Sequence, residues 1–230
     1  MKLTLVGLPL GNIEDISLRA IRALASAKTV ICEDTRVFYK LWQKLVNLGH
    51  LKAKFSGRLM VINDFNEVEK ATWLADQINL AGEAALVSDA GMPLISDPGY
   101  RLVKEIIKRG GEIEVVPGPT AAMTALAISG LSADKVLFLG FLPKKPSKKK
   151  ANWELVKAAD GVTVIIYESP FRVTKTLEEI KTEFGEQTQT VIARELTKEY
   201  EQVLRGSVGG LLANVNKIKG EAVILFRFEK

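Results

Sequence analysis

The sequence is short of the residues that build disulfides, zinc sites and catalytic triads. It has one cysteine, Cys32, and one histidine, His50, among 230 residues. A single cysteine excludes an internal disulfide framework. Structural zinc sites take four Cys or His ligands, so we expect no metal site. A Ser-His-Asp or Cys-His hydrolase would have to use His50, which follows Gly49 in a loop-like stretch with no nucleophile motif nearby.

Long apolar runs are also missing. No run approaches the ~20 residues that a membrane-spanning helix needs, and residues 1–7 show no signal-peptide pattern. Apolar residues make up 47% of the chain and charged residues 26%, a balance that excludes an intrinsically disordered protein. We therefore expect a folded cytoplasmic protein that makes no membrane contact.

Two common nucleotide-binding motifs are absent as well. No G-x-x-x-x-G-K-[ST] sequence marks a P-loop, and no G-x-G-x-x-G follows the first predicted strand. The sequence therefore gives no support to a P-loop protein, a dinucleotide-binding fold or an ordinary Rossmann methyltransferase.

What the sequence does contain is an alternation of short apolar runs and helical patterns. The runs predict strands at residues 3–6, 29–32, 59–62, 84–88, 113–116, 162–166, 190–193 and 222–226. Apolar residues at helical spacing predict helices after Ser17, over 67–81, around 102–107 and over 173–184. Strands that alternate with helices indicate parallel α/β sheets. Because Pro117 and Pro119 prevent a strand from continuing, we predict two α/β domains, residues 1–116 and 117–230.

Four segments are rich in Gly, Pro and Asp, namely residues 7–12, 33–36, 88–99 and 117–120. Three of them directly follow a predicted strand. Ligands of open α/β sheets bind beyond the carboxyl ends of the strands, where glycine lets the backbone approach a ligand closely. Ordinary turn chemistry explains any one of these loops, but four together favour a shared small-molecule cleft.

At these loops the sequence resembles the tetrapyrrole methylase superfamily. The matching segments are LPLGNIEDI at 8–16, EDTR at 33–36, VSDAGMP at 87–93, SDPG at 96–99, PGPTA at 117–121, FLGFLP at 138–143, YESPFR at 167–172 and ARELTK at 193–198. Within the superfamily, the likeness is strongest to the cytidine 2′-O-methyltransferases of small-subunit (16S) ribosomal RNA. Met92 stands where threonine is common and Leu94 where glycine is common. Many members continue after the last strand with a basic helical extension.

The resemblance implies two α/β domains of the class III methyltransferase type, with S-adenosylmethionine bound in the cleft between them. It also implies a homodimer that acts on ribosomal RNA or on the small ribosomal subunit. Carried over by motif, the cofactor contacts would be Leu8, Asp89, Met92, Thr120, Ala121, Tyr167 and Ala222. For Met92, Tyr167 and Ala222, core packing is an equally good explanation, because apolar side chains mostly pack.

The implied reaction is an in-line displacement at the sulfonium methyl by a ribose 2′-oxygen, which a positioned proton acceptor would assist. Polar loops beside strands offer five candidates for this role, and the sequence gives no ground to choose among them: Glu33, Asp34, Glu168, Glu195 and Lys198. If Asp34 pairs with Arg36, or Glu195 with Lys198, those residues shape their loops instead. Arg36, Arg172 and Arg194 would clamp phosphates of the substrate.

Positive charge is in mild excess, with 32 Lys and Arg against 27 Asp and Glu and a net charge of +5. Five lysines fall within seven positions and equal this excess: Lys144, Lys145, Lys148, Lys149 and Lys150. A charge run is often only a solvated surface. Because this run lies beside a predicted RNA-modifying cleft, we interpret it as a mobile loop that contacts the RNA backbone. Arg36, Lys40 and Lys44 form a smaller basic set on one helix face.

Two other functions fit parts of the sequence. A small-molecule methylase acting on a tetrapyrrole would share the cofactor loops but would not need the lysine run. A non-catalytic RNA-binding relative would have lost cofactor binding, and the Asp89 loop and the turn at 117–120 argue against that.

Overall fold

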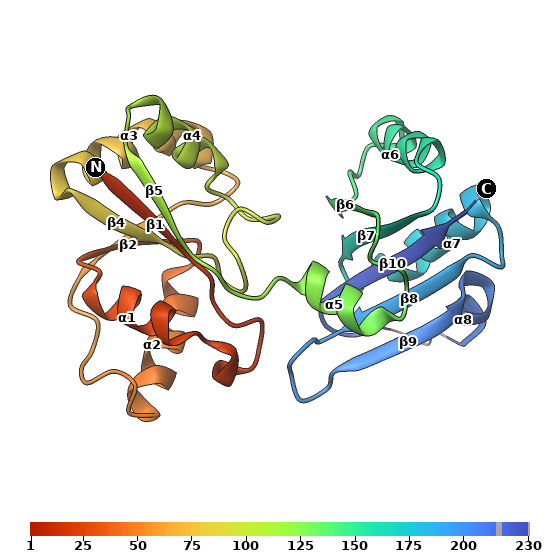
Figure 1. The fold of residues 1–230 in the computed structure, drawn as a ribbon, viewed down its shortest axis with the longest axis horizontal. Coiled ribbons are helices and arrows are strands. Elements are labelled where there is room, and N and C mark those ends of the chain that lie inside the picture. The colour runs from red at the N-terminus through yellow and green to blue at the C-terminus, as the bar shows by residue number, and fades with distance from the viewer. Residues whose placement is uncertain (215–217, 230) are drawn as a thin grey trace. The chain divides into compact units, whose positions relative to one another are not determined.

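The computed structural model describes residues 1–214 and 218–229. The chain divides into two compact units, Met1–Thr120 and Ala121–Lys230. Each unit is built on one five-stranded sheet (Figure 1). The turn at 117–120 belongs to the first unit, because Gly118 packs directly against Gly7 at the end of the first strand.

The first unit contains a wholly parallel sheet with the strand order β3-β2-β4-β1-β5. Its strands are β1 (Lys2–Val6), β2 (Thr29–Cys32), β3 (Arg58–Val61), β4 (Glu83–Leu86) and β5 (Glu112–Val116). All four residues of β2 are buried, as expected of a central strand that is covered on both faces. Parallel strands end at the same edge, so the loops that follow them gather there.

Two helix pairs cover the two faces of this sheet. On one face lie α1 (Leu18–Ser26) and α2 (Thr35–Asn47), and on the other lie α3 (Glu67–Ala81) and α4 (Tyr100–Lys108) (Figure 1). A short 3₁₀ turn, η1 (Ile13–Asp15), precedes α1. Ser17 caps α1 by accepting a hydrogen bond from the Ala20 N–H at 3.0 Å, as predicted.

The second unit contains a mixed sheet with the strand order β6-β7-β10-β8-β9. Its strands are β6 (Val136–Phe141), β7 (Val162–Glu168), β8 (Gln189–Arg194), β9 (Gln202–Ser207) and β10 (Ala222–Phe228). Helix α5 (Ala121–Ser129) packs on one face. Helices α6 (Pro146–Ala158), α7 (Val173–Phe184) and α8 (Val208–Asn214) pack on the other.

The eight predicted strands and the four predicted helices are present, within a few residues at their ends. The expectation of parallel sheets is correct for the first unit and wrong for the second, where only β6 and β7 run parallel. The sequence patterns missed β6, which is interrupted by a register shift between Phe138 and Gly140. They also missed β9, a half-exposed edge strand without a continuous apolar run.

The lysine run was wrongly predicted as a loop. Lys148, Lys149 and Lys150 lie in the first two turns of α6, and Lys144 and Lys145 come just before it. Pro146 occupies the first turn, where its missing N–H costs no helical hydrogen bond. Trp153 and Val156, three residues apart, bury the inner face of the helix. The segment is helical because these two residues anchor it to the sheet.

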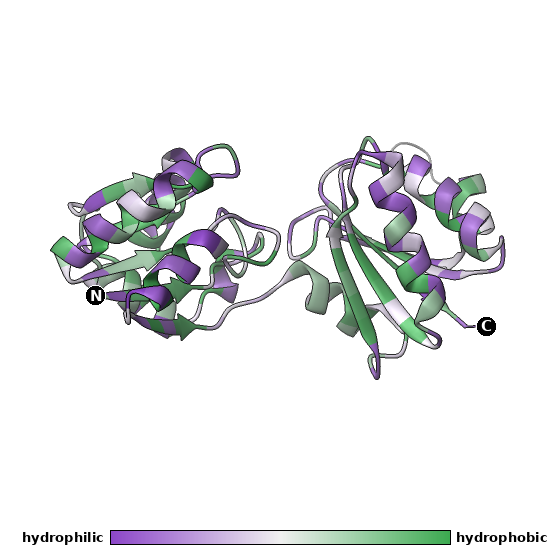
Figure 2. Cartoon of the chain, turned by 90° about the horizontal axis from the view of Figure 1, so that it is seen from above, coloured by the Kyte–Doolittle hydropathy of each residue, from purple (hydrophilic) through white to green (hydrophobic). Residues whose placement is uncertain are grey.

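Hydropathy follows the layers in both units. Figure 2 shows strands that are largely hydrophobic, whereas the helices alternate hydrophobic and hydrophilic residues. Among the helices that the structure describes, none is long and apolar enough to cross a bilayer.

Candidate active site

The carboxyl edge of the first sheet gathers the four Gly-, Pro- and Asp-rich segments. Residues 7–12 follow β1, residues 33–36 follow β2, residues 88–99 lie just beyond β4, and residues 117–120 follow β5. All four therefore lie at the ends of strands. The strands β4, β1 and β5 are neighbours in the sheet, so three of these loops are adjacent.

Backbone contacts fix the loops after β1 and β5 against each other. A Cβ atom on Gly7 would lie 2.5 Å from the Gly118 nitrogen, and one on Gly118 would lie 2.8 Å from the Gly7 Cα. The Gly7 N–H donates to the Val116 carbonyl at 2.9 Å. Close approach, not an unusual φ angle, is what requires glycine at these two positions.

The loop after β4 is tied to the same cluster. The Leu8 N–H donates to the Gly91 carbonyl at 2.8 Å, and the Gly91 N–H donates back to the Leu8 carbonyl at 3.1 Å. The Met92 sulfur lies 3.2 Å from the Gly118 nitrogen and accepts its N–H. Leu8 is buried and Met92 is half-buried. Both candidate cofactor residues therefore help to hold the loop cluster together.

The second part of the β4 loop is held in a strained conformation. Leu94 and Ser96 have φ angles of 72° and 68°, in the left-handed region that favours glycine. Glu67, at the start of α3, accepts hydrogen bonds from the backbone N–H groups of Gly99 and Arg101 at 3.0 and 2.8 Å. This carboxylate caps α4 and fixes the end of the loop.

Asp34 has a structural role at the end of β2. It caps α2 by accepting the Arg36 N–H at 2.8 Å, and its carboxylate pairs with the Arg36 guanidinium at 2.5 Å. The bonds from Arg36 hold the pKa of Asp34 at about 2. The Asp34 N–H donates to Asp89 Oδ1 at 3.2 Å and so joins the loops after β2 and β4. An acid this strong is a poor proton acceptor at neutral pH.

Glu33, the neighbour of Asp34, has the opposite character. It is half-buried, and within residues 1–214 and 218–229 its carboxylate makes no hydrogen bond or ion pair. Burial, followed by the charges of Asp89, Asp97, Asp64 and Asp34, raises its pKa to about 7. Burial also raises the pKa of Asp89, and the charge of Asp34 adds to this effect, while the bond from the Asp34 N–H opposes it. Glu33 is therefore the carboxylate best poised to accept a proton near neutral pH.

In the second unit, Tyr167 links β7 to the start of α5. Its hydroxyl accepts the Ala122 N–H at 3.0 Å, and its ring makes edge contacts with Phe138 and Phe141 at centroid distances of 5.0 and 5.6 Å. Ala121 is the first residue of α5, and Thr120 directly precedes it. Ala222 begins β10 and is buried between its partners Glu168 on β7 and Arg194 on β8.

Glu168 is the most deeply buried of the candidate catalytic groups, at 2% exposure. Thr176 Oγ1 donates to it at 2.7 Å, the Ser169 N–H donates at 2.8 Å, and the Arg172 Nε lies 3.3 Å from its carboxylate. Arg172 also donates to the Leu142 carbonyl at 3.2 Å. These bonds fully occupy Glu168 in fixing the segment 167–172.

Glu195, Lys198 and Arg194 are engaged in a similar way. Lys198 Nζ lies 3.2 Å from Glu195 Oε1 and 2.9 Å from Glu221 Oε2. Burial lowers the pKa of Lys198, but Glu221 and Glu195 raise it by more, so the amine stays protonated. Arg194 donates to Gln202 at 2.8 Å and to the Lys219 carbonyl at 3.1 Å. Glu195 and Thr197 have φ angles of 50° and 65°, which this network maintains.

The lysine run is not uniform. Lys149 is half-buried and its Nζ lies 2.7 Å from Glu179 Oε1, which ties α6 to α7. The other four are exposed: Lys144, Lys145, Lys148 and Lys150. In the described part of the chain, no group of three or more His, Cys, Asp or Glu side chains could hold a metal ion.

Residues 2–212 match the family model of the tetrapyrrole (corrin/porphyrin) methylases. The chain belongs to the tetrapyrrole methylase family. A ribosomal RNA small subunit methyltransferase I from Haemophilus influenzae is 38% identical to it, over 97% of this chain and 77% of the relative. A protein of the same name from Thermotoga maritima is 35% identical over 97% of both chains.

Solved structures agree on the fold. Uroporphyrin-III C-methyl transferase from Thermus thermophilus, complexed with S-adenyl homocysteine, superposes with a TM-score of 0.65 at 18% identity, over 98% of this chain and 97% of that one. The predicted family and α/β fold class are confirmed, and this tetrapyrrole methylase is a methyltransferase, as expected. Sequence reasoning included Glu33 among five equal candidates, and burial together with the surrounding carboxylates is what distinguishes it.

Proposed function

We propose that this tetrapyrrole methylase transfers a methyl group from S-adenosylmethionine to ribosomal RNA of the small subunit, at a cytidine 2′-oxygen. The names of relatives that are 35–40% identical over most of the chain carry this proposal. They favour RNA over a tetrapyrrole as the substrate. Because its substrate is ribosomal, we expect the enzyme to work in the cytoplasm, and we propose that it is a homodimer.

The side chains at the carboxyl edge of the first sheet fit a cationic methyl donor. Glu33, Asp89 and Asp97 make this edge acidic, which favours a sulfonium and an ammonium group. Asp89 is exposed and offers an acceptor for a ribose hydroxyl or for the amino group. The family's contacts assign Leu8, Met92, Thr120, Ala121, Tyr167 and Ala222 to the same ligand. When bound, the donor supplies an activated methyl group on a good leaving group.

Glu33 would accept the proton of the ribose 2′-hydroxyl. The Glu33 carboxylate would take up this proton while the 2′-oxygen accepts the methyl group, which the donor would supply before it leaves as a neutral thioether. The locked loops after β1, β4 and β5 would hold donor and acceptor in line, which supplies much of the rate. Arg36, Arg172 and Arg194, together with the four exposed lysines beside and within α6, would contact RNA phosphates.

The test uses the purified chain, S-adenosylmethionine with a labelled methyl group, and small ribosomal subunits from a strain that lacks the gene. We expect label in the RNA and, after nuclease digestion and mass spectrometry, a 2′-O-methylcytidine. Calorimetry with S-adenosylmethionine separates the alternatives. Donor binding without RNA labelling would indicate a small-molecule methylase, and absence of donor binding would indicate a non-catalytic relative.

A further inference from the structure

Charge is distributed unevenly within the first unit. Residues 16–62 contain nine Lys and Arg and only two acidic residues, a net charge of +7 that exceeds the +5 of the whole chain. Residues 63–116 contain five basic and ten acidic residues, a net charge of −5. The two segments nearly cancel, so the total charge of the chain conceals both.

The fold places the helices of these two segments on opposite faces of the sheet. Helices α1 and α2 cover one face and contain five basic residues and no Asp or Glu. Helices α3 and α4 cover the other face and carry four acidic residues and four basic residues, so their charges cancel. The helices on one side of the unit are therefore basic, and the helices on the other side carry balanced charges.

Eight of the nine basic residues belong to the side of α1 and α2, which we call the α1/α2 basic face. Arg58 on β3 points to the other side of the sheet, where its guanidinium donates to Gln77 on α3. Trp42 Nε1 on α2 donates to the Ala53 carbonyl at 2.8 Å and holds the segment that carries Lys52 and Lys54. The Arg58 N–H donates to the Lys28 carbonyl at 2.8 Å, which joins the other end of that segment to the end of α1. All nine are exposed: Arg19, Arg22, Lys28, Arg36, Lys40, Lys44, Lys52, Lys54 and Arg58.

Most of these cations have no protein partner. Arg36 pairs with Asp34, Arg19 donates to the Val115 carbonyl, and Arg58 donates to Gln77. The side chains of the other six make no hydrogen bond or ion pair within residues 1–214 and 218–229. Surfaces that serve only solubility intersperse charges of both signs. A single-sign face repels itself, and this cost is offset when a polyanion binds.

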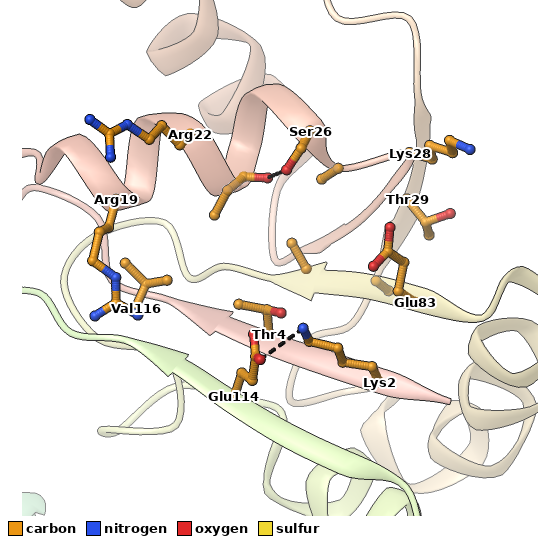
Figure 3. Close-up of a pocket in the computed structure, with 14 residues that line it drawn as sticks. Lys2, Thr4, Arg19, Arg22, Ser26, Lys28, Thr29, Glu83, Glu114 and Val116 are labelled. Carbon is orange, nitrogen blue, oxygen red and sulfur yellow. Dashed lines mark hydrogen bonds and ion pairs between the residues drawn. The ribbon is translucent and has the colours of Figure 1, made fainter.

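A pocket opens at the α1 end of this face. It has a volume of about 300 Å³ and lies between α1 and the sheet, with Arg19, Arg22 and Lys28 in its lining. Figure 3 shows Lys2 on β1 paired with Glu114 on β5 on the sheet side of this pocket. Glu83 and Glu114 are the acidic residues of the lining. Glu114 is neutralised by Lys2, which leaves the α1 side of the pocket cationic.

We propose that the α1/α2 basic face binds the phosphate backbone of the RNA substrate. This inference rests on the proposed function. RNA is the polyanion that the geometry favours, because Arg36 is one turn from Glu33 and the basic face therefore begins at the carboxyl edge of the sheet. A strand bound along α2 would run up to the proton acceptor. The exposed lysines around α6 are then a second contact, not the main one.

The test compares two variants with the same change of charge. Lys40→Gln/Lys44→Gln/Lys54→Gln removes three cations from the basic face, and Arg101→Gln/Lys104→Gln/Lys108→Gln removes three from α4. All six side chains are exposed, and glutamine keeps helix propensity close to that of lysine and arginine. The affinity of each protein for small-subunit RNA is measured between 50 and 200 mM salt, and calorimetry follows donor binding.

We expect the basic-face variant to lose at least about tenfold in RNA affinity. Its slope of log affinity against log salt should fall by about 2, since each lost phosphate contact removes ~0.7–0.9. The α4 variant should match the wild type in both RNA affinity and salt slope.

If the two variants are indistinguishable while the wild type methylates RNA, the basic face is not an RNA surface. If RNA affinity is unchanged but binding to phosphatidylserine vesicles is lost, the face belongs to a membrane contact. A wild type that neither binds nor methylates RNA would overturn the proposed function itself.

Discussion

The polar loops of the two units differ in how their charged groups are used. At the carboxyl edge of the first sheet, Glu33 has no bonding partner among the described residues and Asp89 is bonded only through the Asp34 N–H. In the second unit, Glu168 and Glu195 are enclosed by hydrogen bonds and ion pairs. Family motifs mark both sets of loops equally. The comparison teaches that the first set keeps two of its carboxylates, Glu33 and Asp89, available for chemistry, whereas the second uses its carboxylates to hold the backbone.

The largest expected effect comes from the buried carboxylate of the second unit. Glu168→Ala leaves the Thr176 hydroxyl, the Ser169 N–H and the Arg172 guanidinium without their acceptor, which should lower the free energy of unfolding by about 3–5 kcal/mol. Urea denaturation measures this change. Thr176→Val, which removes one bond only, should cost about 1 kcal/mol. A loss below 1 kcal/mol for Glu168→Ala would mean that its network does not hold the loop.

The next effect is on rate and should leave stability intact. Glu33→Gln removes the proton acceptor and should lower kcat about a hundredfold, with donor affinity and melting temperature preserved. In the wild type, kcat should rise with pH through about 7 and then level off, because only the ionised carboxylate accepts a proton. This acid limb should be absent from the residual activity of Glu33→Gln.

Asp64→Asn is the matched control for Glu33. Asp64 is exposed, and its charge raises the pKa of Glu33, so its removal should move the acid limb to lower pH while the plateau rate is kept. If Glu33→Gln retains the wild-type rate and pH profile, catalysis depends on orientation alone or on Asp89.

Gly7→Ala tests the backbone contact that locks the edge of the first sheet. The new Cβ would lie 2.5 Å from the Gly118 nitrogen, so one loop must move. We expect a destabilisation of about 1–3 kcal/mol and weaker donor binding in calorimetry. Gly206→Ala is a control at a position without a positive φ, where the atom nearest to the new Cβ, Leu211 Cγ, lies 3.8 Å away. If the two variants bind the donor equally well, the contact between Gly7 and Gly118 does not shape the donor site.

The smallest effect is expected at the strained loop. Ser96 is exposed and has a φ of 68°, so Ser96→Gly should relieve strain and stabilise the first unit by about 0.5–1 kcal/mol. Thermal unfolding measures this change. A lower melting temperature would show that the Ser96 side chain supports the loop by contacts that outweigh its strain.

Patterns predicted the elements whose signal is local and periodic. Strand β2 and helix α3 have the predicted bounds, because an unbroken β-branched run and a 15-residue helical pattern leave little choice. Strand β9 lacked such a signal, since an edge strand needs only one apolar side. The helix that contains the lysine run was not predicted, because its two buried residues, Trp153 and Val156, come after the lysines in the sequence.

The sequence was enough to locate the candidate site, but only the structure distinguishes the roles of its carboxylates. Glu33 and Asp34 are adjacent in the chain, yet their pKa values are about 7 and about 2. The two pKa values differ because the Arg36 side chain bonds to Asp34, whereas Glu33 is half-buried and lies near carboxylates on other loops. The order of the strands in the sheet decides which loops lie close together, and the local sequence does not encode that order.

The net positive charge of the α1/α2 basic face, set against the balanced charges of α3 and α4, gives the first unit an electric dipole across its sheet. In the field of a polyanion, a dipole experiences a torque as well as an attraction. The unit would therefore rotate while it is still diffusing, with α1 and α2 turned toward the polyanion before any contact forms. The orientation would be selected during the encounter. Raising the salt concentration would weaken this selection, because it shortens the distance over which the charges of the two molecules interact.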